Sequence, residues 1–323
     1  MFPVPAWLTS PRMRAVGITR FGGPEVLAVV ELPDPVPGPG QVRIRVRAAS
    51  VNPTDTVLRA GARSEALAGI APPWVPGMEL AGVVDATGPD TDWRVGDEVM
   101  AIVLPLRRLG GAQAELVVVP SSWVAPLPRG ATFEQAATLP MNGLTVRLAL
   151  DLLDLQPGQH LGVTGAAGAV GGYAIELAKV DGLHVVADAS PADRELVGGL
   201  GADAVVPRGP GVAAAMRAAV PGGVDAVLDG ALIGAAILPA VRDGGQVAAV
   251  RAWPGGTERD ITIRPVLVSD YAGNQEALAE LGRLAGDERL SLRVAETFPP
   301  EGAPDAHRRL AAGGVRGRLV IVF

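Results

Sequence analysis

The chain has 323 residues, of which 48% are hydrophobic, 19% charged and 4% aromatic, and its formal net charge at pH 7 is −6. This length exceeds one typical domain, and the acidic balance, without a dense run of Lys and Arg, argues against a nucleic-acid partner. Cysteine is absent, which excludes disulfide bonds, thiolate chemistry and the thiolate ligands that structural zinc sites favour.

The N-terminal segment, Met1 to Pro11, contains three prolines and lacks both a basic start and a sustained apolar run. It does not resemble a secretory signal, and we expect a loose extension. No window reaches about 18 consecutive apolar residues without Gly, Pro or charge, so no membrane span is predicted. We therefore expect a cytoplasmic protein with no membrane association.

The first third of the chain predicts strands. Short runs rich in β-branched residues, several of them alternating apolar with polar, are separated by Pro/Gly clusters such as 33–40. The expected strands are 13–18, 27–31, 41–49, 80–87, 98–103 and 114–120. This pattern is typical of an antiparallel, barrel-like domain, which we place at residues 1–125.

From about Pro126 the pattern changes to alternating strands and helices, which predicts a doubly wound parallel sheet over residues 126–265. The expected strands are 160–163, 184–187, 204–206, 224–228 and 246–250, with helices at 171–180 and 191–200. After Pro265 we expect helices at 275–285 and 304–312 and strands at 291–295 and 318–323. A terminal strand this apolar should be paired and buried, so residues 266–323 are expected to return to the first domain.

One turn of the predicted parallel sheet has the composition of a dinucleotide-binding turn. Gly165 to Gly172 reads Gly-Ala-Ala-Gly-Ala-Val-Gly-Gly between an apolar strand and a helix. Gly165 allows a tight exit from the strand, Gly168 lets backbone N–H groups approach phosphates, and Gly171 lets the helix pack closely on the strand. The same predicted pyrophosphate site includes Ala166, Ala167, Ala169 and Val170. The alternative is a structural turn with no ligand.

Family resemblance rests on motifs spread from about Met13 to the last residue. They are Phe21 to Leu27, Val51 to Asp55, Val75 to Glu79, Val95 to Val99, Leu139 to Thr145, Gly165 to Gly172, Leu200 to Asp203 and Gly313 to Arg318. In this order they resemble the zinc-independent quinone oxidoreductase branch of the medium-chain dehydrogenases and reductases. The resemblance implies a GroES-like β-barrel substrate domain, an inserted Rossmann cofactor domain, an active cleft between them and a homodimer.

The resemblance also bears on zinc. The alcohol dehydrogenase branch uses a Cys near the start of the chain and a His at the position that Met78 occupies here. Without any Cys, neither zinc site of that branch can be built, so we expect no metal. Glu79 could still bind a cation alone, but we expect it to be a structural partner within the first domain.

Without a metal, the chemistry left to this fold is hydride transfer from a reduced nicotinamide to an activated acceptor. Quinones and conjugated carbonyls fit, because their oxygen takes up the charge. The resemblance implies that Asn52 and Thr145 are the polar groups near the nicotinamide. Asn52 also begins an ordinary Asn-Pro turn, so capping is the alternative there, and Asp55 and Arg59 stay open between site and structure.

A general acid is harder to find. Family members often carry a Tyr where this chain reads Asp55-Thr56-Val57-Leu58-Arg59. Tyr271 is the candidate for contact with substrate. His160 and His184 precede strands and His307 lies on a surface-like helix, so we expect all three to be structural. Solvent could supply the proton to a quinone.

Cofactor choice depends on the segment after the second strand of the cofactor domain. Asp188 is an acidic residue of the kind that binds the ribose hydroxyls of NAD. The register from the glycine-rich turn, however, matches the family's NAD-specific position to Ala189, and Ser190 and Arg194 match positions that contact the 2′-phosphate of NADPH. We predict NADPH, and Asp188 leaves NADH open.

Further cofactor contacts are expected after the fourth and fifth parallel strands. Asp229, Gly230, Val250 and Arg251 lie where ligands of open α/β sheets bind. Arg318, near the C-terminus, could reach the cofactor or the cleft, with surface charge as the alternative.

These features predict an enzyme, an NADPH-dependent, zinc-independent reductase that transfers hydride to a small-molecule quinone or conjugated carbonyl compound. One alternative is an enoyl reductase acting on an acyl thioester or a biosynthetic intermediate. The other is a non-catalytic NADPH-binding protein.

Overall fold

The computed structural model describes residues 11–323, which divide into two compact units. The first contains the chain up to Met141 together with Ala272–Arg283 and Leu292–Phe323. The second contains Asn142–Tyr271 and Leu284–Ser291. Of the predicted N-terminal extension, Met1 to Pro11, all but Pro11 lies outside the described residues.

The unit boundaries differ from the predicted ones at 125/126 and 265/266. Residues 126–141 stay with the first unit because helix α2 (Phe133–Ala136) contacts its sheet. The buried Ser50 hydroxyl also donates to the Ala137 carbonyl at 2.7 Å. In the second unit, the Glu176 carboxylate accepts the Ser291 N–H at 3.0 and 3.1 Å, which attaches 284–291 to that unit.

The first unit is built on strands. Strands β1 (Arg12–Ile18) and β2 (Leu27–Pro33) form an antiparallel pair. A seven-stranded sheet runs in the order β14-β15-β3-β4-β5-β7, with β6 also paired to β3. Its members are β3 (Gln41–Val51), β4 (Glu79–Thr87), β5 (Glu98–Ile102), β6 (Leu116–Pro120), β7 (Val124–Pro126), β14 (Val294–Phe298) and β15 (Arg318–Val322).

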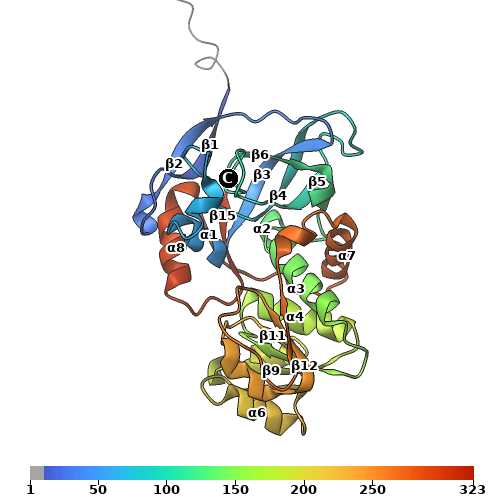
Figure 1. Cartoon of the computed structure of the whole chain (residues 1–323). Coiled ribbons are helices and arrows are strands. Elements are labelled where there is room, and N and C mark those ends of the chain that lie inside the picture. Colours follow the sequence, from blue (N-terminus) through green and yellow to red (C-terminus); the bar gives the residue numbers. More distant parts are fainter. Residues whose placement is uncertain (1–10) are drawn as a thin grey trace, which may run out of the picture. The chain divides into compact units, whose positions relative to one another are not determined.

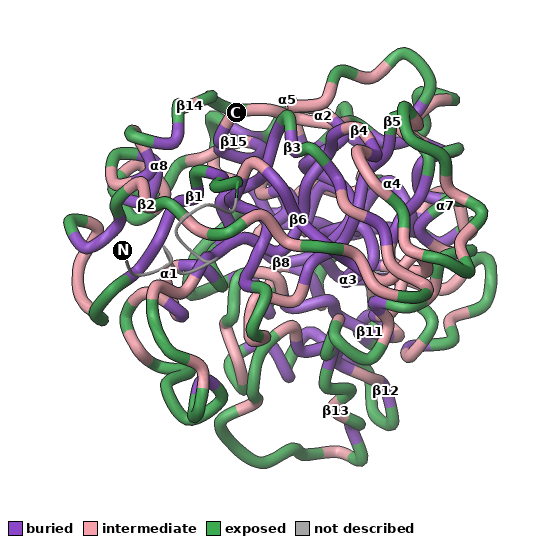
Figure 2. Tube along the Cα trace, turned by 90° about the horizontal axis from the view of Figure 1, so that it is seen from above, coloured by how far each residue is buried: buried purple, intermediate pink, exposed green. Residues whose placement is uncertain are grey.

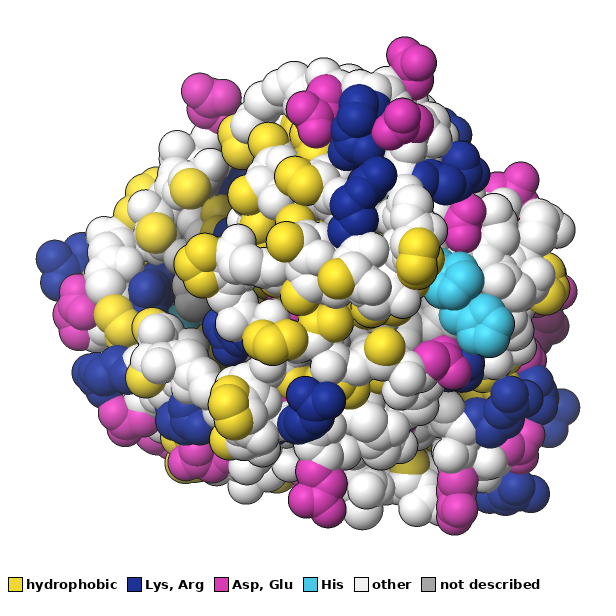
Figure 3. Space-filling view, turned by 90° about the horizontal axis from the view of Figure 1, so that it is seen from below, with side chains coloured by type: hydrophobic (Ala, Val, Ile, Leu, Met, Phe, Trp, Pro, Cys, Tyr) yellow, Lys and Arg dark blue, Asp and Glu magenta, His cyan; other side chains and the backbone are white. Residues whose placement is uncertain are grey.

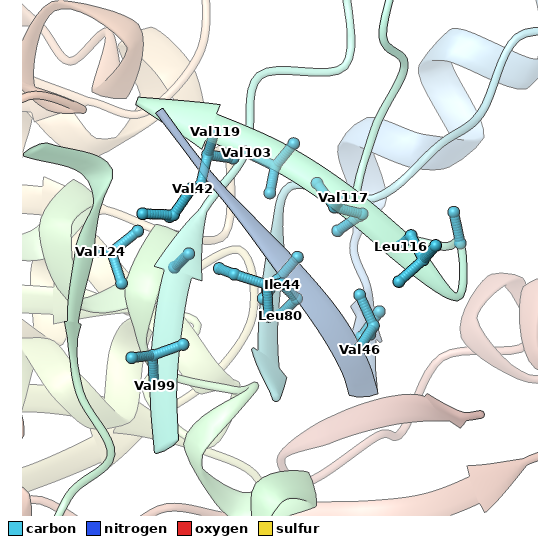
Figure 4. Close-up of a cluster of buried hydrophobic side chains, with 14 of the residues drawn as sticks. Val42, Ile44, Val46, Leu80, Val99, Val103, Leu116, Val117, Val119 and Val124 are labelled. Atoms are coloured by element: carbon cyan, nitrogen blue, oxygen red, sulfur yellow. The ribbon is translucent and has the colours of Figure 1, made fainter. Parts of the chain in front are cut away.

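Strand β3 organises the core of the first unit. Val42, Ile44 and Val46 are buried while the intervening arginines are not, as the period-2 pattern requires. Figure 4 shows these side chains among valines and leucines from β4, β5 and β6. The C-terminal strand β15 pairs with β3, antiparallel, so the predicted return of the chain end to the first domain is confirmed (Figure 1).

The second unit holds a six-stranded, wholly parallel sheet in the order β10-β9-β8-β11-β12-β13. Its strands are β8 (His160–Thr164), β9 (His184–Ala189), β10 (Ala204–Pro207), β11 (Val224–Asp229), β12 (Val241–Ala249) and β13 (Thr262–Pro265). In chain order this is 3-2-1-4-5-6, the doubly wound order in which the strand order reverses between the first and fourth strands. The predicted fold class, a GroES-like domain plus a Rossmann domain, is confirmed.

The remaining helices connect these strands. They are α1 (Pro53–Arg59), α3 (Pro140–Leu153), α4 (Ala169–Val180), α5 (Arg194–Gly199), α6 (Val212–Ala219), α7 (Gln275–Gly286) and α8 (Ala303–Ala311). Short 3-10 helices occur at Pro24–Val26, Ser64–Leu67, Ser121–Trp123, Pro191–Asp193, Gly234–Ala240, Val268–Tyr271 and Pro300–Gly302. Buried residues follow the strands of each unit, and exposed ones lie mainly in loops and on outer helix faces (Figure 2).

Some local predictions differ from the structure in detail. The helix expected at 191–200 begins as a 3-10 helix at Pro191–Asp193 and continues as α5, and the strand expected at 291–295 lies at Val294–Phe298. Helix α3 was not predicted because its first half, residues 140–146, is buried on every side and contains Gly143, so the sequence there shows no amphipathic stripe. No helix within residues 11–323 combines the length and apolarity that crossing a membrane requires.

Surface charges of both signs are interspersed on the face shown in Figure 3. Several pair locally in the second unit, where Arg147 contacts Asp151 at 2.8 Å and Asp181 at 2.9 Å. Such half-exposed pairs contribute little to stability individually.

Candidate functional site

The glycine-rich turn follows β8 directly and has the geometry that the sequence predicted for its glycines. Gly165 adopts φ +66°, a left-handed conformation that favours glycine. A Cβ on Gly171 would lie 2.3 Å from the Gly165 carbonyl oxygen, so no side chain fits there. Gly168 is the N-cap of the 12-residue helix α4. The turn therefore leaves its backbone bare at a helix N-terminus, which fits a pyrophosphate.

Asp188 supports this turn from the neighbouring strand. It lies near the end of β9, is 3% exposed, and its Oδ1 accepts the Ala166 N–H at 3.0 Å. Burial raises the pKa of Asp188, and hydrogen bonds from the Ala166 and Gly165 N–H groups oppose that rise. The carboxylate thus holds the turn in place, which differs from the ribose contact considered for it in the sequence.

The ends of β9 and β10 bring two cations to one edge of the sheet. Arg194 is exposed at the start of α5, and the Ser190 hydroxyl donates to the buried Asp193 carboxylate at 2.5 Å. Arg208, which the sequence interpretation missed, follows β10, and its N–H donates to the Ala189 carbonyl at 3.0 Å. Its charge attracts Asp188. The pairing of β10 with β9 brings Arg208 close to Asp188. The signal in the sequence was a cation shortly after the strand predicted at 204–206.

The loop after β11 is held by a second buried acid. The Thr164 hydroxyl donates to Asp229 Oδ1 at 2.7 Å, and Asp229 also accepts the N–H groups of Ile233 at 3.1 Å and Gly234 at 2.9 Å. Gly230 lies so close that a Cβ would be 2.7 Å from the Thr164 carbonyl oxygen. Asp229 and Gly230 therefore lie beside the glycine-rich turn at the switch point between β8 and β11, where ligands of open parallel sheets bind.

Four further predicted site residues belong to the second unit: Thr145, Val250, Arg251 and Tyr271. Val250 and Arg251 follow the end of β12, Val250 partly buried and Arg251 exposed. Thr145 is on α3 and 7% exposed. The Tyr271 hydroxyl donates to the exposed Asp151 carboxylate, so this hydrogen bond lies at the protein surface. The catalytic role of Tyr271 stays a prediction without support from this contact.

In the first unit, Asn52 lies at the N-terminus of α1 between two buried carboxylates. Its backbone N–H donates to Asp55 Oδ2 at 2.7 Å, and its side-chain Nδ2 donates to Glu79 Oε1 at 2.9 Å. Asp55 Oδ1 accepts the Gly77 N–H at 2.9 Å, and Glu79 Oε2 accepts the Met141 N–H at 2.9 Å. All three side chains are fully buried. We call Asn52, Asp55, Glu79 and Arg318 the carboxylate cluster.

Burial dominates the electrostatics of the carboxylate cluster. It raises the pKa of Asp55 to about 7, against the opposing effects of the N–H groups of Asn52 and Gly77 and of the Arg318 charge. Arg318 is 7% exposed at the start of β15, which places it with Asp55. The surface charge considered as the alternative for Arg318 is therefore wrong. The structural role predicted for Glu79 agrees with its contacts.

His307 differs from its sequence expectation. It is fully buried on the inner face of α8, with Nδ1 at 3.4 Å from Arg59 Nη1. Burial, helped by the Arg59 charge, lowers the pKa of His307 to about 3. The surface position expected for His307 is wrong, because α8 turns its Ala303, Ala306 and His307 face into the unit.

The residues present do not fit a zinc centre. Met78 occupies the position where the zinc-dependent branch has a histidine, and no cysteine occurs anywhere in the chain. Within residues 11–323, no group of three or more His, Cys, Asp or Glu side chains is arranged to hold a metal ion.

Family models match both parts of the chain. Residues 38–129 match the alcohol dehydrogenase GroES-like domain, and residues 200–321 match the zinc-binding dehydrogenase family. The chain is an oxidoreductase of the medium-chain dehydrogenase/reductase class, a family that binds a nicotinamide cofactor.

Individual relatives narrow this class. A solved quinone oxidoreductase from Coxiella burnetii is 28% identical, with a TM-score of 0.83 and coverage of 97% of this chain and 100% of that one. A solved NAD-dependent alcohol dehydrogenase is 30% identical, with a TM-score of 0.83 and coverage of 96% and 100%. A pikromycin polyketide synthase component of Streptomyces venezuelae is 36% identical over 278 residues, which are 78% of this chain but 7% of that protein. The chain belongs to the quinone oxidoreductase-like proteins of the medium-chain dehydrogenase/reductase superfamily.

Proposed function

We propose that the protein is an NADPH-dependent, zinc-independent reductase that transfers hydride to a quinone or a related conjugated carbonyl compound. The observation that carries the proposal is the bare glycine-rich turn at the switch point of the parallel sheet, supported by Asp188 from one side and by the Thr164–Asp229 pair from the other. Similarity to the quinone oxidoreductase from Coxiella burnetii supports the substrate class.

The chain's own residues would bind and orient the reactants. The N–H groups at the start of α4 receive the pyrophosphate, with no side chain from Gly165, Gly168 or Gly171 in the way. When bound, the cofactor supplies the hydride. Asn52 and Thr145 are the proposed polar groups at the nicotinamide end, where a positioned group can orient the ring or stabilise charge on the acceptor oxygen.

NADPH is preferred over NADH because the cations Arg194 and Arg208 lie in the segments that follow β9 and β10. A 2′-phosphate needs fixed cations and N–H donors, which arginine supplies. Asp188, the acid that would favour NADH, has its Oδ1 engaged with the Ala166 N–H instead. The solved NAD-dependent relative makes NADH the comparison that any assay must include.

The proposal needs no metal. The chain lacks cysteine and carries Met78 where a zinc ligand would stand, so the acceptor must already be activated by conjugation. Incubation with a chelator is expected to leave the rate unchanged, and loss of activity that zinc restores would contradict this part of the proposal.

The second candidate is an enoyl reductase that acts on an acyl thioester. The similarity to a polyketide synthase component is the observation that favours it. Hydride would again go to a conjugated carbon, but the pocket would have to admit a longer substrate. A non-catalytic NADPH-binding protein is the outcome if neither acceptor class is reduced.

The deciding experiment measures the initial rate of NADPH oxidation with a simple para-quinone, with NADH and an enoyl thioester in parallel reactions. Rapid quinone reduction that prefers NADPH supports the proposal. Reduction of the thioester alone would favour the second candidate.

We also propose that the protein is a homodimer, which sedimentation velocity would test. The cytoplasmic location stays a prediction.

A further inference from the structure

We propose that the contact between Arg59 of α1 and His307 of α8 is an acid-sensitive latch that holds α8 closed on the first unit. Both helices belong to this unit, and they lie side by side (Figure 1). His307 is fully buried, and its Nδ1 is 3.4 Å from Arg59 Nη1. In this latch a neutral imidazole accepts from a cation, so one proton added to the imidazole breaks it.

The chemistry of the two groups determines the protonation state of His307. A guanidinium has only donors, so Nδ1 must be the acceptor and the ring hydrogen must lie on Nε2. Nε2 is buried, and it has no hydrogen-bond partner among residues 11–323. A proton added to Nδ1 would remove the acceptor and place two cations 3.4 Å apart at a position that water does not reach.

The other charges around α8 are engaged elsewhere. Within the described part of the chain, Arg59 is the charged group that acts on His307, and together with burial it lowers the pKa of His307 to about 3. The charged residues of α8 and of the elements packed against it have these partners or positions: Asp305 pairs with Arg308, Arg309 with Glu296, Glu301 with Arg14, Glu31 with Arg12, and Arg43 and Arg45 with Asp85; Glu25 accepts the Gly23 N–H and attracts Arg59, Arg318 lies with Asp55, and Arg47 is exposed. An imidazolium at position 307 would therefore gain a like charge and no counter-ion from these groups.

The buried face of α8 is small. Its buried residues are Ala303, Ala306 and His307, and the two alanines remove little apolar surface from water. The helix is followed by Gly313 and Gly314, which have φ of +72° and +69° and where a Cβ would meet nothing within 4 Å. This glycine pair gives α8 a pivot, and His307 is the largest of the buried groups that opening would bring to water.

The direction of the pH effect follows from the two states of α8. The pKa of His307 is about 3 in the closed state and returns to the ordinary value of 6.5 when the imidazole meets water. The open state therefore binds the proton more tightly. The advantage of the closed state is complete above pH 6.5 and is lost as the pH falls toward 3. The opening constant of α8 consequently rises about 25-fold between about pH 7 and pH 5.

The experiment measures backbone amide hydrogen exchange along α8 between about pH 7 and pH 5, with each rate divided by the intrinsic exchange rate at that pH. Protection of α8 is expected to fall about 25-fold in the native protein and less than about twofold in His307→Gln. The glutamine oxygen can accept from Arg59 and does not titrate. Asp55, whose pKa is raised to about 7, strengthens the fold as the pH falls through this range, so its titration cannot imitate the latch.

His184→Gln is the matched control. His184 begins β9 in the second unit, and its side chain is 53% exposed, so its replacement should leave the fall in α8 protection at about 25-fold. Helix α6 is an internal control in the native protein, because its buried residues Val212, Ala213 and Met216 carry no titratable group. Its protection should change less than about twofold.

Each outcome supports or overturns the latch. Native α8 protection that does not change with pH would overturn it, and so would an equal fall in the native protein and His307→Gln. An equal fall in α8 and in strand β3, or in α8 and α6, would show a wider unfolding and would overturn a latch confined to α8. If His307→Gln does not fold, the nitrogen NMR spectrum of the native imidazole decides. A neutral His307 with its hydrogen on Nε2 at about pH 5 supports the latch, and an imidazolium in the closed protein overturns it.

Discussion

The glycine-rich turn of the second unit and the carboxylate cluster of the first differ in how the chain assembles them. The turn is one continuous segment, Gly165 to Gly172, and it works through bare backbone at the start of α4. The carboxylate cluster collects buried side chains from segments far apart in the sequence, from Asn52 to Arg318. The turn therefore depends on glycines, which have no side chain to block its backbone. The carboxylate cluster depends on contacts between distant segments, which form only when the chain folds.

The largest expected effect is at the turn. Gly171→Ala would place a methyl group 2.3 Å from the Gly165 carbonyl oxygen, and the helix would have to shift. We expect roughly a 100-fold loss of NADPH affinity and a loss of stability of about 1–3 kcal/mol, measured by fluorescence titration and urea unfolding. Gly198→Ala in α5, where a Cβ meets nothing within 4 Å, is the control and should leave both nearly unchanged. Equal effects of the two substitutions would contradict the comparison.

The carboxylate cluster predicts an unusual pH dependence of stability. The pKa of Asp55 is raised by burial from 3.8 to about 7, so the folded protein binds this proton more tightly than the unfolded chain. The stability that the neutral acid contributes is complete below the unfolded value and is lost as the pH rises to about 7, by roughly 4 kcal/mol at most. Urea midpoints across this range should therefore fall with rising pH in the native protein and fall less in Asp55→Asn.

An acid of the opposite kind is available as a control for that measurement. Asp225 is partly buried, which raises its pKa, but the His160 N–H and the Arg242 guanidinium lower it below the usual value. Its contribution to stability is present above its unfolded pKa and is lost as the pH falls through the folded one. Asp225→Asn should thus reduce stability near neutral pH and leave the loss between about pH 4 and 7 intact. An identical slope in native protein and Asp55→Asn would show that Asp55 is not the group responsible.

A smaller effect tests the edge of the parallel sheet. Arg208→Ala is expected to weaken NADPH binding about tenfold and to leave NADH binding nearly unchanged, because only NADPH carries the 2′-phosphate that a guanidinium would pair with. The ratio of the two dissociation constants is the measurement, and NADH serves as the internal control. A parallel loss for both cofactors would mean that Arg208 supports the fold of this edge and not the choice of cofactor.

The smallest effect is expected at Tyr271. Its hydroxyl bonds the exposed Asp151 carboxylate, and loss of one such surface bond costs about 0.5–1 kcal/mol. Tyr271→Phe should therefore lower the unfolding free energy by that amount. A large fall in turnover would instead indicate that Tyr271 contacts the substrate. It would also show that residues outside the glycine-rich turn and the carboxylate cluster take part in the reaction.

Elements defined by local pattern were predicted well. The alternation in β3, the parallel strands around the glycine-rich turn and the apolar last strand are all visible in short windows of sequence. Helix α3 was missed for the complementary reason, because its first half is buried on every side and has no polar face to reveal the helical period. His307 was misplaced because the charges beside it, Arg308 and Arg309, suggested an exposed face, whereas α8 turns His307 inward.

The sequence by itself determined the class of fold, the glycine-rich turn and the absence of cysteine ligands, since each depends on residue types within one segment or on composition. Tertiary structure alone decided that Asp188 supports the turn, that Arg208 joins the edge beside β9, and that Glu79 faces Asn52. The physical reason is that a hydrogen bond requires two atoms about 3 Å apart. Strand pairing brings those atoms together, and neither of the paired segments by itself shows which partner it will have.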